Sequence, residues 1–135
     1  MRIKKSVATF LRWQRVCRVA TRSRAGTPHV VPVCHVFDGD TLYFGSDGTA
    51  RKIKHLRDNS QIAVTVDLYS DEWSVLRGVM LQGTAELIER GPRFRKIQRL
   101  LYEKFPQYPE QAALGKGAVI VAVTPRHVFT WGLDN

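Results

Sequence analysis

The sequence has no long hydrophobic run and no acidic residue before Asp38. Its longest apolar runs, such as residues 118–123, are far shorter than the roughly 20 residues that a membrane-spanning helix requires. The basic N-terminus is not followed by the apolar segment of a secretion signal. We therefore expect a cytoplasmic protein that does not enter a membrane.

Cysteine is scarce as well. Cys17 and Cys34 are the only two cysteines, and they lack the spacing of a C-x-x-C pair, which favours buried thiols over a disulfide. The neighbours Cys34 and His35 would face opposite sides of a strand, and the other histidines show no ligand spacing. We therefore expect no metal site.

Positive charge is abundant: the chain has 21 lysines and arginines against 12 acidic residues, a formal net charge of +9. A basic surface attracts nucleic acid, acidic lipid or a phosphorylated small molecule, but a solvated face that keeps the protein soluble explains the same charge. Composition alone leaves these alternatives open. The basic residues before Asp38 are Arg2, Lys4, Lys5, Arg12, Arg15, Arg18, Arg22 and Arg24.

The length of 135 residues fits a single domain over residues 1–135. Apolar spacing of three to four residues predicts helices, and alternation between tight turns predicts strands. Short antiparallel strands with outer helices favour an α+β fold built on a small closed or partly closed barrel. The predicted helices are 6–15, 50–57 and one beginning at Gly91-Pro92, and the predicted strands are 17–22, 29–37, 41–45, 61–67, 74–87, 118–124 and 127–131.

Some of these elements carry finer expectations. Ser6 is a plausible cap for the first helix, and Trp13 lies beside its apolar stripe, which predicts that Trp13 is buried. The valines of 29–37 indicate a strand buried on both faces. Gly78 or Gly83 is expected to bend the long strand 74–87.

The most informative segment joins a strand end at Gly45 and Ser46 to a helix that opens with Arg51 and Lys52. The first turn of a helix has free N–H groups and partial positive charge, so it favours an anion. Basic side chains there oppose the helix dipole unless an anion is present. No Walker or G-x-G-x-x-G motif occurs, so the alternatives are a phosphate site and a solvated helix face.

The order of these segments resembles the pyridoxamine 5′-phosphate oxidase-like family of flavin-binding split barrels. The resemblance covers nearly the whole chain, and no single piece is very specific. It is carried by Val19–Thr21, Gly26–Val33, Leu42–Ser46, the Ser-(x)4-Arg-Lys-x-x-x-Leu pattern from Ser46 to Leu56, Gly78–Leu87 and Thr124–Trp131.

The resemblance implies a six-stranded antiparallel split β-barrel with flanking helices. It further implies a homodimer with two equal cofactor sites between the subunits. Arg51 and Lys52 would hold the cofactor phosphate, and Gly45 and Ser46 would lie against the ribityl chain. The strand Met80–Gly83 would approach from the partner subunit. The isoalloxazine ring would lie along Val30, Val31, Pro32 and Val33.

The chain also departs from the name-giving enzyme, whose Arg-x-His element holds the vitamin phosphate. Here Arg126 and His127 are adjacent, and adjacent residues on a regular strand point apart. Oxidation of pyridoxamine phosphate is therefore not expected. The resemblance implies an FMN-dependent oxidoreductase that transfers hydride to or from an unidentified small substrate. A reductase dependent on the deazaflavin coenzyme F-420 and a non-catalytic flavin- or haem-binding protein are the alternatives.

No catalytic residue follows from the sequence. Tyr69 and Trp73 would either cover a substrate or fill a dimer seam, and the seam is the favoured reading. His35 is either a proton donor or, preferably, a buried histidine with its hydrogen bond satisfied. Nucleic-acid binding is not favoured, since Trp13 is the one clear aromatic among the early basic residues.

Overall fold

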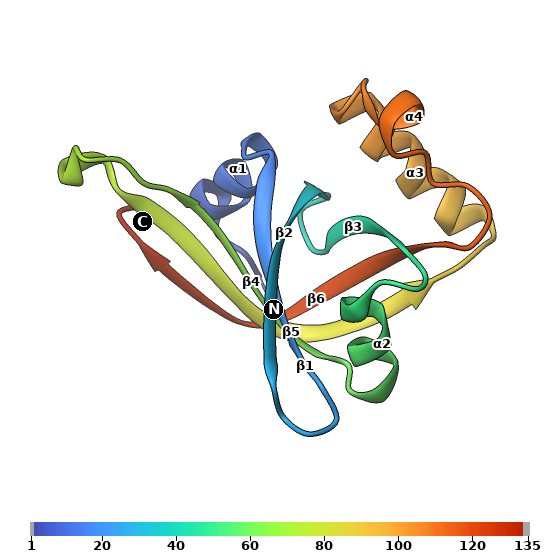
Figure 1. Cartoon of the computed structure of the whole chain (residues 1–135). Coiled ribbons are helices and arrows are strands. Elements are labelled where there is room, and N and C mark those ends of the chain that lie inside the picture. The colour runs from blue at the N-terminus through green and yellow to red at the C-terminus, as the bar shows by residue number, and fades with distance from the viewer. Residues whose placement is uncertain (1, 134–135) are drawn as a thin grey trace.

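The computed structural model describes residues 2–133 and contains a six-stranded antiparallel barrel with helices around it (Figure 1). This confirms the predicted α+β class. The elements are α1 (Lys5–Trp13), β1 (Val16–Arg22), β2 (Pro28–Phe37), β3 (Leu42–Asp47), α2 (Arg51–Asp58), β4 (Gln61–Leu68), the 3-10 turn η1 (Trp73–Val75), β5 (Arg77–Ile88), α3 (Pro92–Lys104), α4 (Tyr108–Gln111) and β6 (Ala118–Trp131).

The strands close in the order β1-β2-β3-β6-β5-β4, with β4 pairing back onto β1. The β2–β3 ladder is short, because only His35–Phe37 pair with Leu42–Phe44. Upstream of His35, β2 leaves β3 and continues beside β1 alone. The barrel is therefore split between the first part of β2 and the end of β3.

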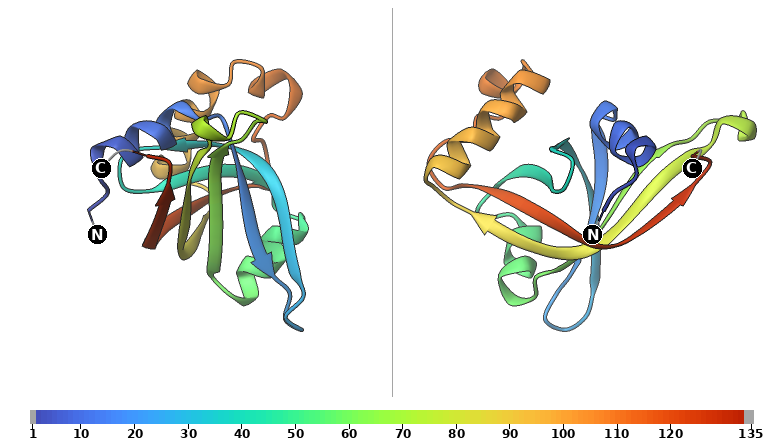
Figure 2. Two further views of the ribbon diagram at one scale, coloured as in Figure 1. Left: turned by 90° about the vertical axis from the view of Figure 1, so that its left-hand side faces the viewer. Right: turned by 180° about the vertical axis from the view of Figure 1, so that it is seen from behind.

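Alternating side chains of the strands fill the barrel, and α1 adds Val7, Phe10 and Leu11 to the same core. A second core packs α3 against β3 and β6. Figure 2 shows β5 and β6 running side by side through a strong common bend, with α3 and α4 beyond the end of β5 and the start of β6. Within residues 2–133, no helix combines the length and apolar character needed to cross a bilayer.

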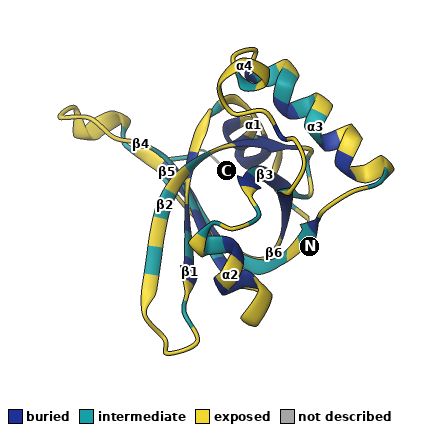
Figure 3. Ribbon diagram, turned by 45° about the vertical axis from the view of Figure 1, so that its right-hand side comes forward, coloured by how far each residue is buried: buried dark blue, intermediate teal, exposed yellow. Residues whose placement is uncertain are grey.

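The predicted burial of β2 on both faces is wrong for its first part. Only His35, Val36 and Phe37 are buried, and Val30 is 65% exposed. The upstream residues alternate between exposed and half-buried, as Figure 3 shows along this strand. The physical reason is the split, which removes β3 as a neighbour on that side.

The end of the barrel differs from the prediction too. The two expected strands 118–124 and 127–131 form one strand, β6, that passes through Pro125. Proline is tolerated here because β6 has a bulge at this point, where Gly83 pairs with Pro125 and Gln82 pairs with His127. Of the two expected bend positions, Gly83 is therefore the one at which the ladder shifts.

Differences also occur in the helices. The first helix begins at Lys5 and has no side-chain cap, so the expected role of Ser6 is wrong. Trp13, expected to be buried, is 77% exposed because it is the last residue of α1 and no described residue covers it. The short helix α4 was not among the predicted helices.

Candidate functional site

The split between β2 and β3 is where the predicted site residues lie. Next to the split, near the end of β3, the hydroxyl of Tyr108 would be only 2.7 Å from a Cβ at Gly45. A Leu114 methyl group would be equally close, so this strand end accepts only glycine without rearrangement. The segment 108–118 thus packs directly on the backbone of β3, and a hollow of about 410 Å³ lies between them.

Ser46 and Asp47 complete the end of β3. Ser46 is buried, and its hydroxyl donates to the carbonyl oxygen of Asp47 at 3.0 Å. The Asp47 carboxylate accepts the backbone N–H and the hydroxyl of Thr49, both at 2.9 Å, which lowers the pKa of Asp47. These bonds fix the turn that delivers the chain into α2.

Helix α2 starts with Arg51, which is exposed, and Lys52, which is half-buried. Its first turn contains no acidic residue, and its N-cap, Ala50, provides no side-chain acceptor. Burial lowers the pKa of Lys52, while the nearby Asp47 carboxylate opposes that shift. The helix start therefore combines an exposed Arg51, a half-buried Lys52 near Asp47 and no side-chain cap, a combination that can bind an anion.

The four predicted ring-contacting residues divide into two faces of β2. Val30 and Pro32 are exposed, whereas Val31 and Val33 are half-buried and pack on the barrel core. Outward on the same strand, Cys34 is exposed, so the expectation of two buried thiols is wrong for this residue and correct for Cys17. The alternation follows from strand geometry and leaves an apolar surface beside the split.

A cluster that the sequence did not indicate lies next to the helix start. Thr21 of β1 pairs with His29 of β2, and a hydrogen bond of 2.9 Å joins Thr21 Oγ1 to His55 Nδ1 on α2. The rings of His29 and His55 meet edge to face at 5.4 Å. No local spacing could have revealed this cluster, because it depends on the β1–β2 register and on how α2 packs.

The other singled-out side chains lie away from the split or in the core. His35 is fully buried and its Nε2–H donates to the carbonyl oxygen of Leu11 at 2.9 Å, which agrees with the favoured reading of a buried histidine for this nitrogen, whereas Nδ1 has no partner among residues 2–133. Tyr69 and Trp73 are 63% and 81% exposed in the β4–β5 connection. Trp131 is half-buried, and its ring would overlap a Cβ at Gly78.

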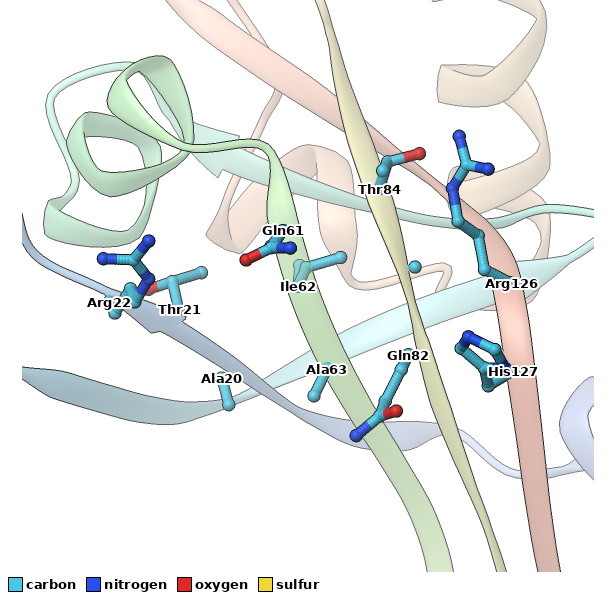
Figure 4. A pocket seen from close by; sticks show the side chains of 11 residues that line it. Ala20, Thr21, Arg22, Gln61, Ile62, Ala63, Gln82, Thr84, Arg126 and His127 are labelled. Carbon is cyan, nitrogen blue, oxygen red and sulfur yellow. The ribbon is translucent and has the colours of Figure 1, made fainter. Parts of the chain in front are cut away.

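The larger hollow of the molecule, about 550 Å³, lies elsewhere, on the outer face of β1, β4, β5 and β6 (Figure 4). Arg126 and His127 both line it, together with Gln82. The bulge leaves Arg126 without a partner in the ladder. In Figure 4 its guanidinium extends away from the ring of His127, so lining one hollow does not contradict the expectation that the two side chains point apart.

Part of the N-terminal positive charge has structural partners. Arg18 and Arg24 form ion pairs with Asp67 and Asp58 at 3.6 and 2.7 Å. Arg15 donates to the carbonyl oxygen of Lys104 at the end of α3 at 2.7 Å. These arginines hold elements together, so they are not freely available to a polyanion.

Comparison with known proteins gives the family. The model of the pyridoxamine 5′-phosphate oxidase family matches residues 3–132. A curated relative, the 5a,11a-dehydrotetracycline/5a,11a-dehydrooxytetracycline reductase of Streptomyces rimosus, is 30% identical over 132 residues, covering 94% of this chain and 81% of the relative.

Solved structures share the fold at lower identity. HutZ, a haem storage protein from Vibrio cholerae, has a TM-score of 0.80 at 16% identity and covers 96% of this chain and 94% of its own. An F420 reductase has a TM-score of 0.70 at 20% identity and covers 94% of this chain and 98% of its own. With the family match spanning almost every residue, the chain belongs to the pyridoxamine 5′-phosphate oxidase family, as its sequence resemblance predicted.

Proposed function

We propose that the protein is an FMN-dependent oxidoreductase that transfers hydride between the bound cofactor and a small substrate. The observation that carries the proposal is the start of α2, where Arg51 and Lys52 stand beside the split without an acidic neighbour in the first turn. Membership of a family whose curated relative is a reductase supports the oxidoreductase class.

The residues present fit a phosphorylated flavin. Arg51 supplies a planar fork of donors and Lys52 a point charge, and both suit a phosphate. A Cβ at Gly45 would strike Tyr108 and Leu114, so these two side chains already cover one side of the β3 backbone at this point. The exposed apolar atoms of Val30 and Pro32 suit one face of a flat aromatic ring.

The bound flavin would supply the hydride chemistry. The task of this chain is to bind and orient it. Arg51 and Lys52 would fix the phosphate, Ser46 and Gly45 would hold the adjoining chain, and Val30–Val33 would set the plane of the ring. Holding cofactor and substrate in a reactive arrangement, with water excluded, is how such a site gains rate without a side-chain nucleophile.

We also propose that the protein is a homodimer whose partner completes the site. The outer face of β1, β4, β5 and β6 is uncovered by any helix in residues 2–133 (Figure 2). It presents small and apolar side chains, including Ala20, Ala63, Met80 and Phe129. On this face, Gln82 and Gly83 line the large hollow, so the segment Met80–Gly83 is suited to approach the cofactor of the partner.

Two alternatives have support of their own. The deazaflavin coenzyme F-420 is favoured by the likeness to an F420 reductase, and a haem-binding role by the likeness to a haem storage protein. Both likenesses are below 25% identity and describe the fold. The cytoplasmic location expected from the sequence also remains a prediction.

Cofactor binding tests the proposal directly. We expect purified protein to bind one FMN per chain, and the double variant Arg51→Ala/Lys52→Ala to bind at least tenfold more weakly because charge-assisted phosphate contacts contribute about 1.5–3 kcal/mol each. Binding is measured by flavin fluorescence. Arg99→Ala/Lys96→Ala is the matched control, which removes the same charge from exposed positions of another helix, α3.

Equal FMN affinity of both double variants would overturn the phosphate assignment. Binding of the deazaflavin coenzyme F-420 in place of FMN would move the function to the first alternative. Haem binding with neither flavin would move it to the second.

A further inference from the structure

His29 is the half-buried member of the cluster beside the start of α2. It sits across from Thr21 in the β1–β2 ladder, and its ring meets the edge of His55. His55 already has a partner, since the buried hydrogen bond to Thr21 occupies its Nδ1. In this cluster a hydrogen bond to Thr21 fixes His55, whereas no such bond within the described residues fixes Nδ1 of His29.

The Nδ1 atom of His29 is shielded from solvent and has no hydrogen-bond partner among residues 2–133. A buried nitrogen without a partner costs free energy that a suitable ligand can recover. His29 also directly precedes the β2 segment Val30–Val33 that we propose for the flavin ring. Its side chain shares the half-buried face of Val31 and Val33, opposite the exposed Val30 and Pro32, and this is the face that meets His55 of α2.

The charges that act on His29 are positive. Burial lowers the pKa of His29 most, and His55, Arg51 and Lys52 lower it further. Asp47, which faces Lys52, is not among the groups that act on His29. Thr21, across the ladder on β1, is uncharged. A lowered pKa favours the neutral form of His29 in the free protein at pH 7, and a bound phosphate would offset the positive charge of Arg51 and Lys52 that helps to lower it.

Resting on the proposed phosphate site, we propose that His29 is a third ligand of that phosphate and takes up one proton from solvent when the phosphate binds. The proton enters the imidazole ring, so that both ring nitrogens become donors. The phosphate then meets an imidazolium in addition to Arg51 and Lys52. Cofactor binding is thereby coupled to proton uptake.

The sign of the pH dependence follows from this coupling. The bound form holds one proton more than the free form at a pH between the two His29 pKa values, so affinity falls as pH rises through that interval. The second ionisation of a phosphate monoester, near pH 6, has the opposite effect at lower pH. The fall in affinity above about pH 6.5, where the phosphate is already mostly a dianion, therefore reports the contribution of His29.

The test measures the His29 imidazole itself by NMR in wild-type protein. We expect its pKa to rise by about one unit when FMN or inorganic phosphate is added, and to stay unchanged with riboflavin, which lacks the phosphate. A rise of one unit corresponds to a total change in affinity of tenfold, which is approached only over a pH range that spans both His29 pKa values. His29→Gln, and His29→Asn as a second variant, should flatten the dependence of FMN affinity on pH.

The outcomes separate this proposal from the function on which it rests. An unchanged His29 pKa in protein that has bound FMN, with equal pH profiles for wild type and both variants, would overturn proton uptake and leave the cofactor assignment intact. Failure to bind FMN, together with a raised His29 pKa in inorganic phosphate, would overturn the FMN function and support the anion site. Failure of both would overturn both.

Discussion

His35 shows how a single polar side chain can be held inside the barrel. It is fully buried, and its Nε2–H donates to the backbone carbonyl of Leu11. A carbonyl oxygen only accepts, so this bond requires the proton on Nε2 and leaves Nδ1 without a partner in the described part of the chain. Burial lowers the pKa of His35 to about 4, although the bond to Leu11 opposes the shift.

This shift predicts a loss of stability in mild acid. The unfolded chain binds a proton at His35 near pH 6.5 and the folded chain only near pH 4, so stability falls between these values. The loss attributable to His35 is about 3 kcal/mol. Urea unfolding of wild type and His35→Gln from pH 7 to 4, at one protein concentration, measures it. Equal acid sensitivity of the two proteins would contradict the prediction.

At the scale of elements, local patterns predicted nearly all strands and the three longer helices. These predictions were wrong where the pairing between strands, rather than the local sequence, determines the structure. Pro125 and Arg126 have the composition of a turn, but the bulge opposite Gln82 and Gly83 lets one strand run through them. The valine-rich sequence of β2 is typical of a buried strand. However, β2 pairs with β3 at only three positions, so the valines upstream of His35 lack β3 as a neighbour.

The bulge yields a prediction about strand β5. A Cβ at Gly83 would overlap the carbonyl oxygen of Thr124, which belongs to the backbone of β6 and cannot swing away as a side chain can. We expect Gly83→Ala to lower the free energy of unfolding by about 1–3 kcal/mol, the usual cost of overpacking.

Gly115→Ala is the matched control, because a Cβ there meets no atom within 4 Å. Denaturant unfolding of both variants at one protein concentration makes the comparison. If Gly83→Ala were as stable as Gly115→Ala, the close approach of β5 and β6 at the bulge would be wrong.

For the candidate site, the sequence predicted residues that are adjacent in the chain and missed residues that only the fold brings together. Arg51 and Lys52 are adjacent in the chain, so their position at a helix start was predictable from the strand end before them. The cluster of Thr21, His29 and His55 draws on three separate elements. Only the register of β1 on β2 and the packing of α2 on β1 bring it together.

At the scale of the whole molecule, the hollow beside the end of β3 and the larger hollow lie on different surfaces. The basic start of α2 lies beside the split, whereas the larger hollow lies on the outer sheet face and is lined by Arg22, Gln82 and Arg126. Arg22 and Arg126 have no ion pair within the described residues, unlike Arg18 and Arg24. In a two-fold dimer that buries the outer sheet face, Arg22 and Arg126 would be able to contact the phosphate proposed at the split of the partner subunit.

This arrangement predicts that association and cofactor binding fail together. Met80 and Ala63 lie on the outer sheet face, so an arginine at either position would place an unpaired charge in the proposed interface. We expect Met80→Arg to shift the mass in solution from that of two chains of 15.4 kDa to that of one, and to weaken FMN binding at least tenfold.

Glu103→Arg, on the exposed side of α3, is the control for the charge change and should remain dimeric and bind FMN normally. Light scattering after size exclusion gives the mass, and flavin fluorescence gives the affinity. A Met80→Arg protein that stays dimeric would remove the sheet face from the interface. A monomer with full FMN affinity would instead show that one chain builds the whole site, because the split alone would then supply every contact that the cofactor needs.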